Sequence, residues 1–295
     1  MVEFTIVTPG FRQLDWLACC IASVADQEGV TIEHIVQDAG TVGFSDFVEK
    51  MRKRWPDREG YRRIMISESD AGMYDAINKG LKRGSGRICA YLNCDEQYLP
   101  GALAQVRDEF TRHPKAEILF GGFLVVDAQG RLVTAQKPVR MFWPHVATSH
   151  LPNFTCATFF RRSLLEGNTA WFDPSYRACG DAAWMIARLR ARTPSRKIPK
   201  YLAAFTEQTA SQGLSELGTE EAIRLRKAQP LWVQKLGGLW KLAHWGLKVF
   251  SGHYFPSSVS SGIYPYGQAA GPRQPMRGLV WPFWPARLCG PTGRS

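Results

Sequence analysis

Residues 67–80 read Ser-Glu-Ser-Asp-Ala-Gly-Met-Tyr-Asp-Ala-Ile-Asn-Lys-Gly, and residues 84–96 read Gly-Ser-Gly-Arg-Ile-Cys-Ala-Tyr-Leu-Asn-Cys-Asp-Glu. The first stretch predicts a helix over residues 72–83, with an acid just before its start and glycines after its end. The second predicts an apolar strand over residues 87–92 that ends in two adjacent carboxylates. A helix followed by a short glycine turn and a buried strand is typical of a parallel sheet with helical crossovers.

The same alternation continues on both sides of this stretch. Further strands are predicted over residues 4–8, 32–37, 63–67 and 156–160, with a hairpin over 123–134. Further helices are predicted over residues 13–25, 45–55 with Ser45 as N-cap, 100–112 and 181–192. The pattern predicts an α/β, Rossmann-like fold with a mostly parallel central sheet covered by helices. Ligands bind beyond the carboxyl ends of the strands in such sheets, and polar clusters follow four of these strands.

The charge is distributed unevenly along the 295 residues, although their ordinary composition excludes a disordered or fibrous protein. The net charge is +11, yet the last acidic residue is Glu221, and residues 222–295 hold ten basic residues. We therefore predict a globular unit over residues 1–220 and a basic, Trp-rich extension over residues 221–295. Because the excess charge belongs to the extension, no nucleic-acid partner is expected.

The seven cysteines are odd in number and form no C-x-x-C pair, so we expect reduced thiols, with Cys19 and Cys20 in the core. The chain starts without a basic segment followed by an apolar run, and no 18-residue stretch is continuously apolar. We therefore expect neither a secretory signal nor a simple membrane span, and a cytoplasmic location.

Four acidic positions could carry chemistry. Asp95 and Glu96 repel each other unless a cation lies between them, and Mg²⁺ or Mn²⁺ prefers such oxygens; the alternative is a solvated turn or a helix cap. Asp38 could accept hydrogen bonds from a nucleobase or ribose, or it could form a turn. Asp181, at a helix start, could accept a hydroxyl proton, or it could cap the helix.

The helix after Asp70 could favour an anionic ligand through its N-terminus and Lys79. Asp75, Asn78 and Lys79 are spaced three and four residues apart, which predicts one shared face. The alternative is an amphipathic helix with a polar outer face, and for Asp75 we prefer that interpretation.

Taken together, these stretches resemble a family-2 glycosyltransferase with the GT-A fold, over about residues 4–189. The family pattern S-E-x-D-x-G-[IM]-Y-D-A-x-N-K-G, followed by [TS]-G-x-[IV]-x-x-[FLY]-L-N-x-D-[DE], is matched by residues 67–96. Residues 154–164 and 172–181 resemble the acceptor-side segment and the catalytic acid. A match of this length is far more specific than a lone short motif.

The resemblance implies inverting transfer of a sugar from a nucleotide-diphosphate sugar, UDP- or dTDP-linked, to a glycan or lipid-linked hydroxyl. Residues 1–120 would bind the donor and residues 121–220 the acceptor. Asp181 matches the general base, and Asp95 and Glu96 match the element that holds a divalent cation, Mn²⁺ or Mg²⁺. The nucleotide-sugar contacts implied by the resemblance are Thr8, Pro9, Phe11, Asp38, Asp70, Lys79, Asn93 and Asp95.

The chain also departs from the family pattern. Residues 10–12 read Gly-Phe-Arg where an aromatic-Asn pair is usual, and residues 38–43 read Asp-Ala-Gly-Thr-Val-Gly where D-G-x-S-x-D is common. Asn93 replaces the first acid of a D-x-D element, and no second acid closely follows Asp181. These departures motivate an alternative, a nucleotide-binding or scaffold protein without turnover. A third class, single-strand nucleic-acid binding by the basic tail, is less favoured.

The extension has its own pattern. Residues 231–250 predict a helix with apolar positions at 232, 236, 239, 243, 247 and 250, and with Lys241 and Lys248 on another face. Lysines and tryptophans so placed are typical of a helix lying on an anionic membrane surface, which would place residues 231–295 on the inner face of the cell membrane. The alternative is that the aromatic residues, with Trp-Pro-Phe-Trp at 281–284, pack on the catalytic domain. Three further arginines add charge there: Arg273, Arg277 and Arg287.

Overall fold

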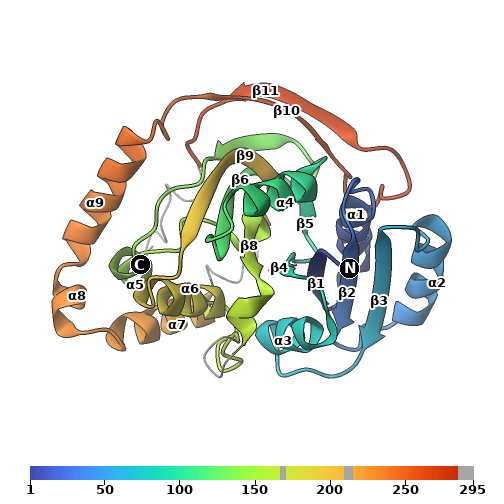
Figure 1. The fold of residues 1–295 in the computed structure, drawn as a ribbon, viewed down its shortest axis with the longest axis horizontal. Coiled ribbons are helices and arrows are strands. Elements are labelled where there is room, and N and C mark those ends of the chain that lie inside the picture. The colour runs from blue at the N-terminus through green and yellow to red at the C-terminus, as the bar shows by residue number, and fades with distance from the viewer. Residues whose placement is uncertain (167–170, 209–214, 285–295) are drawn as a thin grey trace, which may run out of the picture.

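A computed structural model describes residues 1–166, 171–208 and 215–284, and nine strands of this part form one curled sheet (Figure 1). The strand order is β3-β2-β1-β4-β8-β6-β9-β5, with β7 paired to β6. The first four strands are parallel, but β8 runs antiparallel to both β4 and β6. The strands are β1 (Phe4–Gly10), β2 (Ile32–Asp38), β3 (Tyr61–Ser67), β4 (Ile88–Tyr91), β5 (Glu96–Tyr98), β6 (Ile118–Val126), β7 (Leu132–Gln136), β8 (Thr158–Arg161) and β9 (Ser195–Thr206).

Helices cover both faces of the sheet, as the alternating pattern predicts. Phe4 and Ile6 of β1 pack with α1 and α4 on one face, whereas Val7 packs with α3 and α6 on the other. The helices of the domain are α1 (Leu14–Ala25), α2 (Phe44–Arg54), α3 (Met73–Arg83), α4 (Ala102–Arg112), α5 (Trp143–Thr148) and α6 (Gly180–Arg190), with short 3₁₀ turns η1 (Thr155–Ala157) and η2 (Arg162–Leu165).

The glycine turn between α3 and β4 has a packing reason. A Cβ on Gly86 would lie 2.4 Å from the backbone carbon of Phe4, so the chain passes too close to β1 for any side chain. This close approach leads the chain into β4 beside β1, and it positions the 93–96 turn at the end of the parallel strands.

Several boundaries differ from the sequence prediction, and three of the differences are larger or concern a cap. The N-cap of α2 is Gly43, and Ser45 lies inside the helix, so the predicted Ser45 cap is wrong. Helix α4 starts at Ala102 rather than at residue 100, because Gly101 is its N-cap. The strand predicted over residues 156–160 begins as the turn η1 and becomes β8 only at Thr158.

The extension runs along the rim of the domain as α7 (Glu216–Lys227), α8 (Leu231–Lys235), α9 (Gly237–Phe250) and an antiparallel ribbon of β10 (Ser257–Ile263) and β11 (Gln274–Val280) (Figure 1). The prediction of a single helix over residues 231–250 is wrong, because the helix is interrupted at Leu236, between α8 and α9. The ribbon packs on the domain: Arg273 pairs with Asp26 at 2.6 Å.

Among the described residues, no helix is long and apolar enough to cross a membrane. The six cysteines in this part of the chain are free thiols, and Cys19 and Cys20 are fully buried as expected. Cys289 and Arg287 lie outside the described residues.

Candidate active site

The 93–96 turn holds the two adjacent carboxylates in different settings. Glu96 is 2% exposed, and its Oε2 accepts a hydrogen bond from the Asn93 amide at 2.8 Å. Asp95 is partly exposed, and its Oδ2 accepts a hydrogen bond from Gln208 Nε2 at 3.0 Å. The burial of Glu96 excludes the solvated turn as an explanation of this motif.

Both carboxylates of this turn resist ionisation. Burial raises the pKa of Asp95, and it raises the pKa of Glu96, which the adjacent Asp95 charge raises further. The Oδ1 atom of Asn93 is buried and has no hydrogen-bond partner among the described residues. Two carboxylates with raised pKa values beside an unpaired amide oxygen form an oxygen-rich donor set, which suits a hard divalent cation.

Asp181 lies in the first turn of α6 and is partly exposed. Its Oδ1 accepts hydrogen bonds from the Ala182 amide at 2.7 Å and from the Tyr74 hydroxyl at 3.3 Å. Burial raises the pKa of Asp181 to about 6. A small apolar cavity of about 10 Å³ is lined by Asp181 together with Tyr91 and Trp184. A carboxylate with this pKa is ionised at neutral pH and still basic enough to take a proton.

The structure brings Asp181 close to the 93–96 turn. Burial raises the pKa of Tyr91, and the charges of Asp181 and Glu96 raise it further. The Asp181 charge also contributes to the raised pKa of Glu96. Tyr91, at the end of β4, and Asp181 also line one small cavity, although they are far apart in the sequence.

Asp38, at the end of β2, is buried and fully engaged. Its Oδ2 accepts hydrogen bonds from the Gly40 amide at 2.9 Å, the Thr41 amide at 2.8 Å and the Ser67 hydroxyl at 2.8 Å. These contacts are those of the turn-forming alternative, and they tie the end of β2 to the end of β3. A nucleotide contact by Asp38 stays a prediction.

The three residues predicted at the end of β1, which are Thr8, Pro9 and Phe11, have different surroundings. Thr8 shares the inward face with Phe4 and Ile6, and its hydroxyl lies 2.9 Å from His34 Nε2. The Pro9 carbonyl accepts a hydrogen bond from the Cys94 thiol at 3.1 Å, which joins β1 to the 93–96 turn. Phe11, just after β1, is 52% exposed.

A cleft of about 670 Å³ lies next to this edge, between the β1 and β2 ends. The Arg12 amide donates to Thr41 Oγ1 at 2.9 Å, and this bond holds the two loops together. Tyr266 of the extension forms part of the wall and packs against Trp16, with ring centroids 4.5 Å apart and the rings tilted by 52°. The cleft is large enough for a small-molecule ligand.

Lys79 of α3 reaches back to the loop that precedes the helix and contains Asp70. Asp70 Oδ1 accepts a hydrogen bond from the Gly72 amide at 2.8 Å. Lys79 pairs with Asp75 at 3.0 Å and donates to the Ser69 carbonyl at 2.9 Å, which confirms the outer-face interpretation of Asp75. The prediction that Asn78 shares a face with Asp75 and Lys79 is wrong. Asn78 is buried, and its side-chain amide donates a hydrogen bond to the Phe172 carbonyl at 2.7 Å.

Sequence reasoning missed the residues that support Asp181 and Asp95. Glu221 accepts hydrogen bonds from three successive backbone amides just before Asp181, those of residues 177, 178 and 179, at 2.7–2.9 Å. Gln208 contacts Asp95, and Tyr74 contacts Asp181. Tyr74 stood inside the quoted motif, but Glu221 and Gln208 carried no signal of their own.

A curled sheet of this topology, with helices on both faces, defines the class of fold as GT-A. The family model described as "Glycosyl transferase family 2" matches residues 5–168. This match covers more than half of the chain, and the chain therefore belongs to glycosyl transferase family 2.

Curated relatives agree with this membership. A PGL/p-HBAD biosynthesis glycosyltransferase of Mycobacterium tuberculosis is 24% identical over 179 residues, which is 60% of this chain and 66% of the relative. The putative teichuronic acid biosynthesis glycosyltransferase TuaG of Bacillus subtilis is 26% identical over 127 residues, 43% of this chain and 48% of TuaG. The chain thus spans slightly less than two thirds of the mycobacterial relative and about half of TuaG.

Solved structures share the fold. S. aureus TarS 1-349 in complex with UDP-GlcNAc superposes with a TM-score of 0.59 at 14% identity, covering 85% of this chain and 75% of that one. The mannosyltransferase PcManGT of Pyrobaculum calidifontis, in complex with GDP-Man and Mn²⁺, gives a TM-score of 0.55 at 15% identity, covering 85% of this chain and 74% of that one.

Proposed function

We propose that the chain is an inverting glycosyltransferase that moves a sugar from a nucleotide-diphosphate sugar to a hydroxyl of a glycan or lipid-linked acceptor. One observation carries the proposal: Asp181 lies near enough to Glu96 for its charge to raise the pKa of Glu96. An inverting displacement needs a base on the acceptor side and a charge-neutralising element on the diphosphate side.

Asp181 is the proposed base. The acceptor oxygen attacks the anomeric carbon as the bond from that carbon to the diphosphate oxygen breaks, and the hydroxyl proton goes to Asp181. Because burial raises the pKa of Asp181 to about 6, the group is mostly ionised at pH 7. It is also a stronger base than an exposed aspartate, so its proton affinity is better matched to the reaction.

Asp95, Glu96 and Asn93 would hold the donor phosphates and ribose together with a divalent cation. The fit rests on the donor set, which is all oxygen and includes the unpaired Asn93 Oδ1. A bound Mn²⁺ or Mg²⁺ would neutralise charge on the departing diphosphate. Gln208 positions Asp95 through the hydrogen bond to its Oδ2.

The nucleotide would lie along the ends of β1, β2 and β3. In this proposal Phe11 stacks on the base, the backbone at Thr8 and Pro9 supports it, and Asp38, Asp70 and Lys79 line the ribose and phosphate side. A UDP or dTDP base is favoured, since TarS structures hold UDP and UDP-GlcNAc. PcManGT holds GDP-Man, so the experiment below includes GDP.

Calorimetry and thermal-shift measurements with UDP, GDP, dTDP and CDP, each with Mn²⁺, Mg²⁺ or EDTA, test the donor site. One diphosphate should stabilise the wild type in a metal-dependent manner, and the Asp95→Asn/Glu96→Gln pair should lose this effect. Asp108→Asn, an exposed acid on α4, is the matched control and should behave as wild type. Binding of none of the four would overturn the proposal and favour a scaffold without turnover.

We propose further that α9 rests on an anionic membrane surface, on the cytoplasmic side of the cell membrane. Its outer face exposes Leu239, Leu242, Trp245, Val249 and Phe250, with Leu242 at 61% and Trp245 at 56%. The predicted apolar positions 232, 236, 239 and 250 also face outward, whereas Val233, Gly237 and His244 are buried. An apolar stripe beside lysines, in an extension without acids beyond Glu221, suits an interface with anionic lipid.

Vesicle sedimentation tests the membrane proposal. The wild type should bind vesicles containing phosphatidylglycerol, less so in high salt, and poorly bind pure phosphatidylcholine. Leu242→Glu/Trp245→Glu should weaken this binding more than about 10-fold, because two apolar side chains leave the interface. Val42→Glu places the same charge at an exposed apolar residue far from α9 and serves as control. Wild-type binding that ignores lipid charge, or that survives the double substitution, would overturn the proposal.

A further inference from the structure

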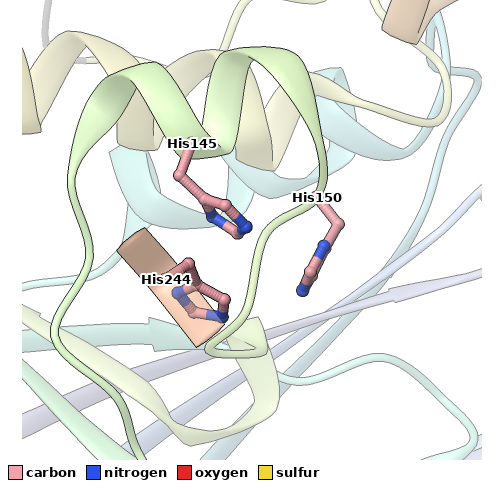
Figure 2. Close-up of side chains that lie close together, drawn as sticks. All are labelled: His145, His150 and His244. Carbon is pink, nitrogen blue, oxygen red and sulfur yellow. The ribbon is translucent and has the colours of Figure 1, made fainter. Parts of the chain in front are cut away.

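Three imidazoles converge between α5 and α9, outside the proposed active site (Figure 2). His145 lies in α5, His150 follows its end, and His244 comes from α9 of the extension. One nitrogen from each ring lies within 4.8 Å of the others. The rings of His145 and His244 stack with centroids 3.9 Å apart, and His150 stands edge-on to both.

The two inner rings are buried without the partners that imidazoles need. His145 is 1% exposed and His244 is 4% exposed. Nδ1 of His145 and both ring nitrogens of His244 have no hydrogen-bond partner among the described residues. A buried polar atom without a partner costs about 1–3 kcal/mol, so three such atoms in one cluster call for a ligand.

The chemistry of the cluster selects one class of ligand. Burial disfavours the charged form of both inner rings, and a neutral imidazole can donate a lone pair to a metal ion. Neutral imidazoles suit Zn²⁺ and other first-row transition metals and do not suit Mg²⁺ or Ca²⁺. Ser149 Oγ, 3.0 Å from His150 Nδ1, orients the third ring as an outer-shell partner.

We propose that His145, His150 and His244 form a binding site for a transition-metal ion, with Zn²⁺ preferred and the fourth position held by water. Zn–N bonds are about 2.0–2.1 Å, so side-chain rotations that draw the nitrogens inward complete the site. Because the ligands come from the domain and from α9, the metal fixes the extension to α5. This site is separate from the oxygen donors of Asp95 and Glu96, and it differs from them in metal preference.

The test uses the full chain without a polyhistidine tag, stripped with EDTA and dialysed. We expect calorimetry to show about one equivalent of Zn²⁺ bound in the presence of excess Mg²⁺. Co²⁺ should give the strong visible absorption of a four- or five-coordinate nitrogen site, which octahedral Co²⁺ on oxygen ligands lacks. Zn²⁺ should also raise the melting temperature of the wild type.

His150→Gln is the decisive variant because His150 is exposed and its loss should leave the fold intact. Removing this ligand should weaken Zn²⁺ binding more than about 100-fold, beyond the loss typical of outer-shell changes. His244→Asn tests the buried ligand, and His113→Gln, at the end of α4, is the matched control. Absence of Zn²⁺ binding, binding unchanged in His150→Gln, or binding lost only with Asp95→Asn would each overturn the proposal.

Discussion

The hydroxyl of Tyr74, on α3, donates a hydrogen bond to Oδ1 of Asp181, on α6, across 3.3 Å. The two helices meet closely there, since a Cβ on Gly180 would lie 2.6 Å from the Tyr74 ring. Tyr74 is fully buried and stacks on Phe172. The motif that decides the first half of the fold therefore also sets the orientation and proton affinity of the proposed base in the second half.

Tyr74→Phe should move the acidic limb of the pH–rate profile to higher pH. The hydrogen bond from Tyr74 lowers the pKa of Asp181, so its loss raises that pKa above the present value of about 6. Since the base must be ionised, kcat/KM should fall at pH 6 and recover at pH 8. The buried hydrogen bond lost should cost about 1 kcal/mol of stability. An unchanged acidic limb would show that Tyr74 does not affect the ionisation that controls the reaction.

Asp181→Asn should remove transfer while leaving the donor site intact. We expect kcat to fall by about 10²- to 10⁴-fold, the usual contribution of a general base, with the affinity for the nucleotide diphosphate unchanged. A sugar-transfer assay measures the fall in kcat, and calorimetry measures the affinity for the nucleotide diphosphate. Full transfer activity in this variant would exclude Asp181 as the base.

The same variant should be more stable than the wild type at high pH. The folded-state pKa of Asp181 is raised from 3.8 to about 6, so the ionised group destabilises the fold above pH 6, and this penalty disappears as the pH falls to 3.8. Asparagine carries no such penalty, and its gain should be about 1–3 kcal/mol at pH 8 and small at pH 4. Urea unfolding at both pH values measures it. A gain of the same size at both values would show that the effect is not electrostatic.

Glu221→Gln should slow transfer without weakening the donor complex. The Glu221 carboxylate accepts hydrogen bonds from three backbone amides of residues 177–179, and these hold the start of α6 in place. The glutamine amide has no charge and one acceptor oxygen fewer than the carboxylate. The substitution should therefore lower the free energy of unfolding by about 2 kcal/mol. Glu220→Gln, at the exposed neighbouring position, is the control. Equal losses in both variants would mean that the effect is not specific to the α6 start.

The sequence predicted the sheet and the acids because both depend on local patterns. Strand β1 was predicted from its apolar run, and Asp95, Glu96 and Asp181 from their positions at strand and helix ends. The roles of Glu221 and Gln208 depend on chain segments that return from far away in sequence, and no local pattern encodes those contacts. Asn78 was misplaced because spacing on a helix does not reveal that Phe172 lies against its inner side.

The extension was harder to predict for a different reason. Apolar residues occur around much of α8 and α9, so periodicity alone offers more than one candidate inner face. The domain selects the inner face through α5, where Trp240 meets Phe142 and His244 stacks on His145. The result leaves most of the predicted apolar positions exposed and turns His244 inward, which only the packed structure reveals.

Arg273→Ala should release the β10–β11 ribbon from the domain. Arg273 donates from Nε and Nη2 to the two Asp26 oxygens at 2.6 and 2.7 Å, and from Nη1 to the Tyr98 carbonyl at 2.9 Å. The pair is only partly exposed, so its loss should cost about 2 kcal/mol, less than the loss of a fully buried pair, and should lower the melting temperature by about 4 °C. Hydrogen exchange should quicken at residues 257–280 and stay unchanged in the central sheet. Arg277→Ala, exposed on the same ribbon, should leave both measurements at wild-type values, and exchange that quickens equally in the two arginine variants would contradict the role given to Arg273.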